Sequence, residues 1–367
     1  ALAVAAAALL GALTAAMSAF YERCVARAAH GAPASRLWGA LARTVLKGQL
    51  WGYFEGETDF GRQLEAFEPN AKFSAPAAAA AAEGGEASPL KELVAEARRA
   101  YDVKHVYAWH ALHGYWRGAS AELGAAEGVA VVQAAPVPSK HQLKVEPQLG
   151  WDPMTLFGAG VVADDGASLD KFYGKLHGTL AAAGIDGVKV DVQAAVGCIG
   201  GGGGGGGVAL VRRYTRAMEA SVQQKFAAND CINCMCHSTE NLYAYESTAV
   251  ARASDDFYPT RPESHTAHLV NVAYNSILIG EICLPDWDMF HSLHEVGALH
   301  AAARAVGGCA VYVSDAPGRH DVALLRRLVL PDGSTLRARL PGRPTRDCLF
   351  ADVSADGSSA LKVWNSN

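Results

Sequence analysis

The sequence predicts an α/β fold: a (β/α)8 TIM-type barrel, incomplete on its N-terminal side, followed by the start of a C-terminal antiparallel β-domain. Between residues 101 and 328, short β-branched runs alternate with helical patterns at least six times, which indicates parallel strands joined by crossover helices. Polar residues gather where these predicted strands end, and in a barrel such ends meet at one mouth. After residues 331–333 the helical patterns give way to short alternating segments, so residues 329–367 predict the β-domain.

Composition narrows the classes of function. Half of the 367 residues are hydrophobic and the net charge is -5, which disfavours a nucleic-acid partner because such a partner requires a basic face. Most of the eight cysteines lie in apolar runs, as reduced buried thiols do. We therefore expect a protein of a reducing compartment, the cytoplasm or a plastid.

Residues 1–100 predict a helical and low-complexity N-terminal region. The first 20 residues are uncharged and rich in alanine, and their length would suit a membrane helix or a signal segment. No basic residue precedes them and alanine is only weakly apolar, so we favour a buried or low-complexity helix and expect the chain to be part of a larger protein. Residues 74–88 indicate a loop, and Pro89 then begins an amphipathic helix that reaches Tyr101.

The barrel elements follow from hydrophobic periodicity. Strands are predicted at residues 103–110, 187–192, 231–237, 249–254, 276–283 and 309–314. Helices are predicted at residues 169–183, 208–228, 262–273, 294–306 and 321–328. The stretch 118–166 is punctuated by glycine and proline, and we assign it no strand. Short strands are also expected at 336–340, 348–353 and 360–364.

Two motifs could indicate a bound ligand, but we predict no ligand at either of them. The glycine run at residues 200–207 lacks the spacing and the Gly-Lys-Ser/Thr of a phosphate loop, so we interpret it as a flexible insertion. Cys231 and Cys234 form a Cys-x-x-Cys pair, but no second pair follows at zinc-finger spacing. We expect no metal and no cofactor.

Lys189 and Asp191 lie two residues apart in the strand predicted at 187–192, so their side chains share one face. A structural ion pair is the ordinary interpretation of two such residues. The functional interpretation is a carboxylate that the neighbouring ammonium keeps ionised, as a nucleophile requires.

A second arrangement favours the functional interpretation. Arg252, Ser254 and Asp256 share a face if their strand persists, and Asp256 would then approach Asp191 across the barrel mouth. Asp256 would be the less charge-compensated carboxylate, so that one carboxylate is ionised and the other carries a proton. Such a pair performs glycoside cleavage, with a carboxyl separation of about 5–5.5 Å if configuration is retained.

Other side chains at the predicted mouth suit a sugar. The aromatic residues Trp109, Tyr115, Trp116 and Trp287 could stack on sugar faces, although such residues are also ordinary core. Asp286 and Asp288, with Asp191, could instead hold a magnesium ion, but Lys189 already supplies positive charge there.

Five stretches carry a specific resemblance that covers residues 101–367. These are residues 106–116, 186–193, 252–257, 285–292 and 340–350. In them the chain resembles the plant-type raffinose synthase, seed imbibition protein and alkaline α-galactosidase group of glycoside hydrolase family 36. The resemblance implies that Asp191 is the nucleophile and that Asp256, the last residue of an Arg-x-Ser-x-Asp pattern, is the acid/base, with Asp255 as the fallback. The residues expected to line the sugar site are Lys189, Trp109, His110, Arg252, Asp255, Asp286 and Asp288.

The resemblance leaves three functions open. The first is retaining transfer of a galactosyl unit from galactinol to sucrose, and the second is hydrolysis of raffinose-family oligosaccharides by an alkaline α-galactosidase. The third is an inactive sugar-binding fragment, because we find no match to the family's early barrel strands upstream of Tyr101. The expected partners are small sugars, with no nucleic acid and no membrane.

Overall fold

The computed structural model describes residues 61–69, 88–146, 149, 153–163, 165–199 and 206–366. The predictions for residues 1–50, for the loop 74–87 and for the glycines 200–205 lie outside these residues. The chain divides into two units, Ala1–Arg62 and Gln63–Asn367. The elements described below belong to the second unit. None of its described helices combines the length and apolar character that crossing a bilayer requires.

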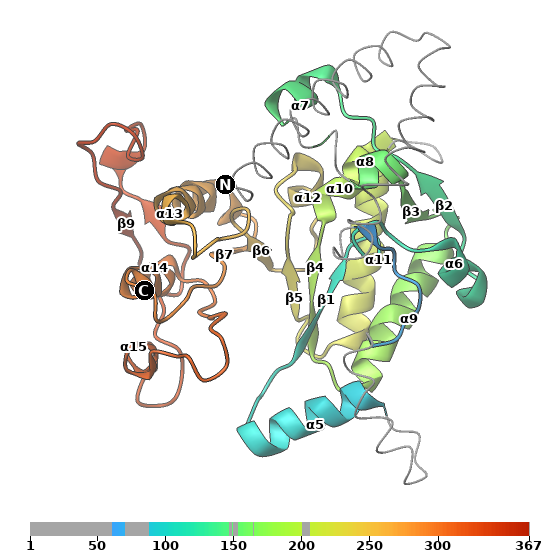
Figure 1. Ribbon diagram of the computed structural model, residues 1–367, viewed down its shortest axis with the longest axis horizontal. Coiled ribbons are helices and arrows are strands. Elements are labelled where there is room, and N and C mark those ends of the chain that lie inside the picture. Colours follow the sequence, from blue (N-terminus) through green and yellow to red (C-terminus); the bar gives the residue numbers. More distant parts are fainter. Residues whose placement is uncertain are drawn as a thin grey trace, which may run out of the picture. The chain divides into compact units, whose positions relative to one another are not determined.

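Five parallel strands form the central sheet (Figure 1), in the spatial order β1-β4-β5-β6-β7. Their bounds are Tyr107–Ala111, Gly187–Asp191, Cys231–Asn233, Val250–Arg252 and Leu284–Asp286. The predicted α/β class with parallel strands is confirmed. The prediction of at least six parallel strands is wrong for the described residues, where this sheet has five.

The segment 309–314 was expected to form the sixth strand. It makes only an isolated parallel bridge, between Phe290 and Val313. The chain between β7 and Phe290 turns through Asp288, whose φ is 61°, so the extended backbone that a longer ladder needs is interrupted there.

The residues of β4 explain its place inside the sheet, between β1 and β5. Val188 and Val190 are fully buried on one face, where β-branched side chains pack well. At Gly187 the next strand approaches so closely that a Cβ atom would lie 2.5 Å from the Asp230 carbonyl oxygen. Glycine is therefore required where β4 begins.

Helices α9 and α11 pack side by side and cover the face of the sheet that carries Val188 and Val190 (Figure 1). They span Ser168–Ala182 and Gly206–Lys225, close to the predicted ranges. Phe172 and Tyr173 of α9 and Tyr214 of α11 are buried in this core. Helix α5, Pro89–Tyr101, matches its prediction, and α10 and α12 span Gln193–Cys198 and Thr239–Leu242.

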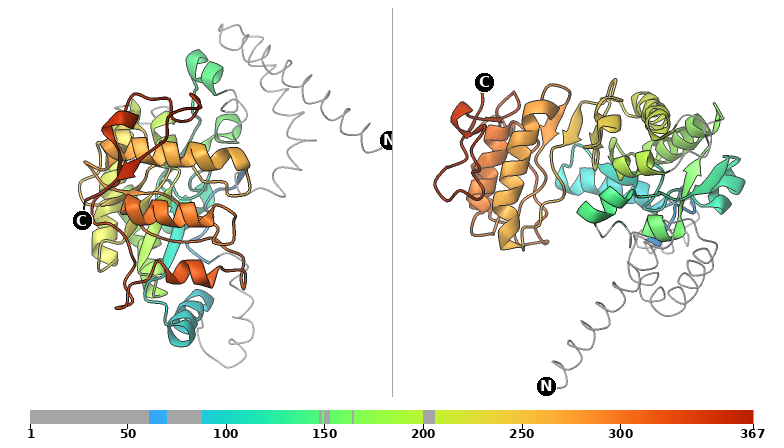
Figure 2. Two further views of the ribbon diagram at one scale, coloured as in Figure 1. Left: turned by 90° about the vertical axis from the view of Figure 1, so that its left-hand side faces the viewer. Right: turned by 90° about the horizontal axis from the view of Figure 1, so that it is seen from above.

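Helices α13 and α14 lie side by side beyond β6 and β7 (Figure 2), and a hydrogen bond between His265 and His300 joins them. Their bounds are Pro262–Ile279 and Gly297–Gly307, and α15 spans Val322–Arg326. The prediction of a strand at 276–283 is wrong, because α13 continues through Ile279. Ser276 is buried in this helix and accepts a hydrogen bond from Nε1 of Trp287, so the apolar run is a packed helix end.

The stretch 118–166 contains elements that the sequence did not reveal. They are helices α6, α7 and α8, at Ala121–Glu127, Lys140–Val145 and Pro153–Phe157, and the antiparallel strands β2 and β3, at Val131–Ala134 and Ala159–Val162. Gly118 and Gly160 cross in backbone contact, where a Cβ on either would lie within 2 Å of a carbonyl oxygen. Glycine at these two positions therefore lets two chain segments cross in close contact, so it does not only indicate loops.

The C-terminal residues contain fewer strands than expected. The turn at 331–333 is confirmed by an antiparallel bridge between Val329 and Thr335. Strands β8 and β9, Arg343–Pro344 and Val363–Trp364, pair in antiparallel fashion. Residues 336–340 form no strand, and a 3₁₀ helix, η5, spans Arg346–Cys348 at the start of the strand predicted at 348–353. The separate β-domain stays a prediction.

Candidate active site

Three of the parallel strands end in charged residues at one edge of the sheet. Asp191 is the last residue of β4, Arg252 the last of β6 and Asp286 the last of β7. Trp109 lies in β1, where it pairs with Lys189. Because all these strands are parallel, their C-terminal ends lie on the same side, as the sequence predicted.

Asp191 is buried, with 7% of its surface exposed, and its two carboxylate oxygens have separate donors. Nε1 of Trp109 donates to Oδ2 at 2.9 Å, and the backbone N–H of Val192 donates to Oδ1 at 2.7 Å. Val192 has a φ of 55°, the left-handed conformation that turns the chain from β4 into α10. The indole and the turn together fix the orientation of the carboxylate.

The ordinary interpretation of Lys189 and Asp191, a structural ion pair, is wrong, whereas the role of Lys189 in keeping Asp191 ionised stays a prediction. Both residues lie in the described part of the chain, and no ion pair joins them there, although they share a strand face. The positive charge of Lys189 instead helps to lower the pKa of Asp288. The carboxylate of Asp191 is thus oriented by neutral donors.

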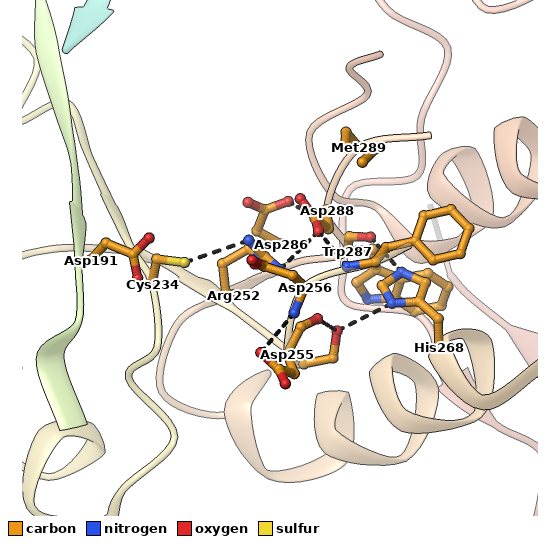
Figure 3. A network of polar contacts seen from close by, with 12 residues as sticks. Asp191, Cys234, Arg252, Asp255, Asp256, His268, Asp286, Trp287, Asp288 and Met289 are labelled. Carbon is orange, nitrogen blue, oxygen red and sulfur yellow. Dashed lines mark hydrogen bonds and ion pairs between the residues drawn. The ribbon is translucent and has the colours of Figure 1, made fainter. Parts of the chain in front are cut away.

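Arg252 is the charged centre of the site (Figure 3). It is 1% exposed, and its Nη2 atom donates to Asp288 Oδ2 at 2.8 Å and to Asp256 Oδ1 at 3.1 Å. Its Nη1 atom lies 3.5 Å from Sγ of Cys234. We expected Asp256 to be the less charge-compensated carboxylate, and this is wrong, because Asp256 has the arginine as its partner.

Cys234 connects this centre to Asp191. Burial raises the pKa of the Cys234 thiol; Arg252 opposes the rise and the nearby Asp191 carboxylate adds to it. The Cys234 thiol lies between the Asp191 carboxylate and Arg252 (Figure 3), and Arg252 in turn contacts Asp256. The separation of Asp191 and Asp256 and the split in their charge states stay predictions.

Asp286 and Asp288 differ in electrostatics although they are two residues apart. Burial raises the pKa of Asp286, and hydrogen bonds from Tyr312 only partly oppose this. Burial would also raise the pKa of Asp288, but the Arg252 guanidinium and the backbone N–H of Phe257 bring it below its usual value. For Arg252, burial disfavours the charge, yet Asp288 and its neighbours raise the pKa overall.

The assignment of Asp256 as the acid/base assumed that its strand continues from Arg252 to Asp256. Strand β6 ends at Arg252, so regular alternation does not carry the pattern on to Asp256. Asp256 still contacts Arg252, whereas Oδ1 of Asp255 accepts the backbone N–H of Asp256. The choice of Asp256 over Asp255 stays a prediction that the arginine contact supports.

Two expected sugar contacts lie elsewhere. His110 is 4% exposed and contacts Nε2 of His177 at 3.1 Å, on the helix-covered face opposite Trp109. Trp287 is 1% exposed, and its indole N–H is bonded to Ser276 within the core. We therefore leave both out of the site. Trp109, Tyr115 and Trp116 form an aromatic cluster beside Asp191, with ring centroids 5.5 and 5.7 Å apart.

Three residues of the site escaped the sequence analysis. Cys234 was interpreted as a structural cysteine, and Tyr312 and Arg304 lie in a segment and a helix to which we assigned no site residue. Tyr312 donates to the carboxylate of Asp286, and Arg304 donates to the backbone of the loop after β7. In the sequence these residues could be noticed only as polar side chains inside apolar runs. Residues with a purely structural role show the same pattern.

No group of three metal-ligating side chains is placed to hold an ion within the described ranges. The carboxylates of Asp286 and Asp288 are instead engaged by Tyr312, Arg252 and backbone N–H groups. Cys231, Cys234 and Cys236 are buried free thiols.

Comparison with known proteins identifies the relatives of this chain. The family described as raffinose synthase or seed imbibition protein Sip1 matches residues 53–367. A probable galactinol–sucrose galactosyltransferase 6 of Arabidopsis thaliana is 51% identical over 278 residues, which cover 76% of this chain and 36% of the relative. A probable galactinol–sucrose galactosyltransferase 1 of the same plant is 45% identical over 313 residues, 85% of this chain and 41% of the relative.

A galactinol–sucrose galactosyltransferase of Oryza sativa subsp. japonica is 42% identical over 278 residues, which cover 72% of this chain and 34% of the relative. In these three comparisons the aligned part of the chain spans 34 to 41% of the relative's length.

Proposed function

This chain belongs to the raffinose synthase or seed imbibition protein family, and from that premise we propose that it carries the catalytic residues of a retaining α-galactosyl transfer. The donor would be galactinol and the acceptor sucrose, the two sugars in the names of the relatives. Asp191 would be the nucleophile and Asp256 the acid/base. The buried, doubly hydrogen-bonded carboxylate of Asp191 at the end of β4 is the observation that carries this proposal.

In the first step, one oxygen of Asp191 attacks the anomeric carbon of the donor as the bond to the leaving oxygen breaks. Asp256 gives its proton to that oxygen, so that myo-inositol departs. In the second step, Asp256 takes the proton of the incoming sucrose hydroxyl, whose oxygen displaces Asp191 from the same carbon. Two displacements on one carbon retain its configuration.

Contacts to both carboxylates support these roles. The Trp109 indole and the Val192 N–H orient the Asp191 carboxylate and leave lone pairs on each oxygen for the attack. Arg252 holds Asp256 from a fully buried position and is itself held by Asp288. Lys189, Trp109, Arg252, Asp255, Asp286 and Asp288 remain the proposed sugar-site residues.

We also propose that the five-stranded sheet is part of a (β/α)8 barrel covering residues 101–328. Parallel order, a helix-covered face with α9 and α11, and polar strand ends at one edge support this. Residues 329–367 would begin the C-terminal β-domain, and β8 with β9 would be its first antiparallel pair. The seven free cysteines of the described residues support a cytoplasmic or plastid location.

Hydrolysis by an alkaline α-galactosidase is the second candidate. The side chain of Asp256 is 58% exposed, so water could reach the base that activates the acceptor. Both reactions share the first step and differ only in the second acceptor, which is a sucrose hydroxyl or water.

The test is to incubate the purified protein with galactinol, with and without sucrose, and to resolve the products. Raffinose that appears only with sucrose supports transfer, whereas free galactose in both mixtures supports hydrolysis. No product in either mixture supports the inactive sugar-binding fragment. A 2-fluoro galactosyl inactivator then identifies the nucleophile: the labelled peptide should contain Asp191, and Asp191→Asn should take up no label. A label on another carboxylate would overturn the assignment.

A further inference from the structure

We propose that Arg304 is a positioning residue that holds the loops after β6 and β7 in one arrangement. It would do so by direct bonds to one loop and through a chain of two histidines to the other. These loops carry Asp256 and Asp288, so the consequence for catalysis rests on the proposed function. The geometry itself does not depend on it.

The first part of the argument is the environment of Arg304 in α14. Its side chain is completely buried, and its donors reach three consecutive backbone carbonyls. Nε donates to the oxygen of Asp288 at 3.1 Å, and Nη2 donates to those of Trp287 and Met289 at 2.9 Å. A planar fork of five N–H donors can bind a loop in this way, whereas the ammonium of a lysine cannot.

The loop after β7 needs such support. Asp288 has a φ of 61°, a left-handed conformation that an L-residue with a side chain adopts only at a cost in free energy. From this conformation its Oδ2 atom accepts from Arg252 at 2.8 Å and from the N–H of Phe257 at 2.9 Å. If the backbone relaxed, the carboxylate would leave both donors. Arg304 thus holds Asp288 where it binds Arg252 and the loop after β6.

The second part is a directional chain of hydrogen bonds. Nη1 of Arg304 lies 2.7 Å from Nδ1 of His300, and because a guanidinium only donates, this nitrogen must accept. His300 then carries its proton on Nε2 and donates to Nδ1 of His265 at 2.8 Å. His265 in turn carries its proton on Nε2 and donates to the carbonyl of Pro259 at 2.9 Å. Each bond fixes the tautomer of the next ring.

Burial supports this order of donors and acceptors. Burial and the adjacent Arg304 lower the pKa of His300 to about 3, so the ring is neutral and Nδ1 can accept. The chain ends on Pro259, three residues after Asp256.

The third part is the packing between the two loops. The ring of Phe257 stacks on His268 with centroids 4.5 Å apart and lies 4.6 Å from the ring of His300. Nε2 of His268 is 2.9 Å from the Trp287 carbonyl oxygen, and Nδ1 is 3.3 Å from Oγ of Ser254 (Figure 3). The loop after β6 is therefore anchored on both sides of Asp256, by Ser254 before it and by Phe257 and Pro259 after it.

The structural test uses nuclear magnetic resonance on the purified protein. Long-range proton–nitrogen correlation should show His300 and His265 as the tautomers with the proton on Nε2. In Arg304→Lys, His300 should lose this single tautomer, and the amide of Phe257 should exchange with solvent about tenfold faster. His265→Phe, which removes the bond from His300 and the bond to Pro259 but leaves Arg304 on its three carbonyls, should speed exchange of the amides of residues 257, 258 and 260 and leave Asp288 protected.

The kinetic test compares the same variants. Arg304→Lys should lower kcat about tenfold or more and leave KM within about twofold, since the sugar contacts stay and the catalytic geometry is lost. The matched control is His177→Phe, which removes a buried, hydrogen-bonded histidine from the core beside α9. It should lower stability without changing the Phe257 amide or kcat.

A proton on Nδ1 of His300 or His265 in the wild type would overturn the proposal. Unchanged Phe257 exchange in folded Arg304→Lys would do so as well, and if that variant does not fold, His265→Phe and the wild-type tautomers decide. A wild-type protein without galactosyl transfer would refute the proposed function alone, because the tautomers and exchange rates are measured without substrate.

Discussion

Nε1 of Trp109 donates a 2.9 Å hydrogen bond to Oδ2 of Asp191, from one strand of the sheet to its neighbour. Trp109 pairs with Lys189, two residues before Asp191, so the indole reaches diagonally toward the strand end. The same tryptophan packs against Tyr115 and Trp116. One side chain thus orients the proposed nucleophile and forms part of the aromatic wall beside it.

Trp109→Phe should lower kcat/KM for an α-galactoside by about tenfold to a hundredfold, because one hydrogen bond to a charged oxygen is lost while most of the packing stays. Steady-state kinetics measure the change. Trp364→Phe, at a half-exposed position in β9, is the matched control and should keep wild-type rates. Equal rates for Trp109→Phe and wild type would show that the indole bond does not serve the reaction.

Asp191→Asn should reduce kcat by about a thousandfold or more at nearly constant volume, because the amide cannot attack the anomeric carbon. Thermal unfolding should show the variant folded. In Asp191→Ala, azide in the vacated space should attack an activated α-galactoside and give the β-galactosyl azide. An α-azide, or a fully active Asp191→Asn, would contradict the assignment.

Asp256→Ala should slow donors with poor leaving groups at least about tenfold more than donors with activated leaving groups, since only the former need a proton. Asp255→Ala is the control, because its carboxylate accepts a hydrogen bond from the backbone N–H of Asp256 and forms no ion pair with Arg252 within the described residues. Rates for two donors with leaving groups of different pKa distinguish the variants. The opposite pattern would transfer the acid/base role to Asp255.

The free energy of unfolding should fall as the pH decreases from 7.5 to 5.5. Burial lowers the pKa of six histidines. One is His237, and the other five are lowered to about 4 for His110, His113 and His268, about 3 for His300 and about 2 for His177. Unfolded histidine has a pKa of about 6.5, so below that pH the unfolded chain binds protons that the native chain does not. This stability is complete above about pH 6.5 and is lost toward the lower native values, at roughly 1.4 kcal/mol per pH unit for each histidine.

Urea unfolding at both pH values measures this loss. His177→Phe should make this pH dependence shallower, because one of the buried histidines is removed. A free energy of unfolding that stays constant over this range would refute the prediction.

Much of the parallel sheet could be predicted because its cause is local. Val188 and Val190 alternate with Lys189 and Asp191, and one face is buried while the other carries the polar side chains. The strand predicted at 276–283 failed for the opposite reason. Its apolar run is consistent with a strand or a buried helix end, and the bond from Trp287 to Ser276, which packs the helix end in the core, is not visible in the sequence.

The sequence proposed the residues of the candidate site but not their contacts. Lys189 was expected to keep Asp191 ionised, and Asp256 was expected to be the less charge-compensated carboxylate. The actual contacts cross between strands and loops, from Trp109 to Asp191 and from Arg252 to Asp256. Neighbourhood in sequence does not report such contacts, because they depend on where separate strands end.

The burial of His110 also affects how β1 is aligned with β4. If β1 slipped by one residue along β4, every side chain of β1 would change faces. His110 would lose His177 and its place in the core, and the indole of Trp109 would enter the space between the sheet and α9. A buried polar group without its partner costs about 1–3 kcal/mol. The contact between His110 and His177 thus disfavours the slipped alignment. Because His110 stays on the helix-covered face, the edge strand β1 presents Trp109 to Asp191.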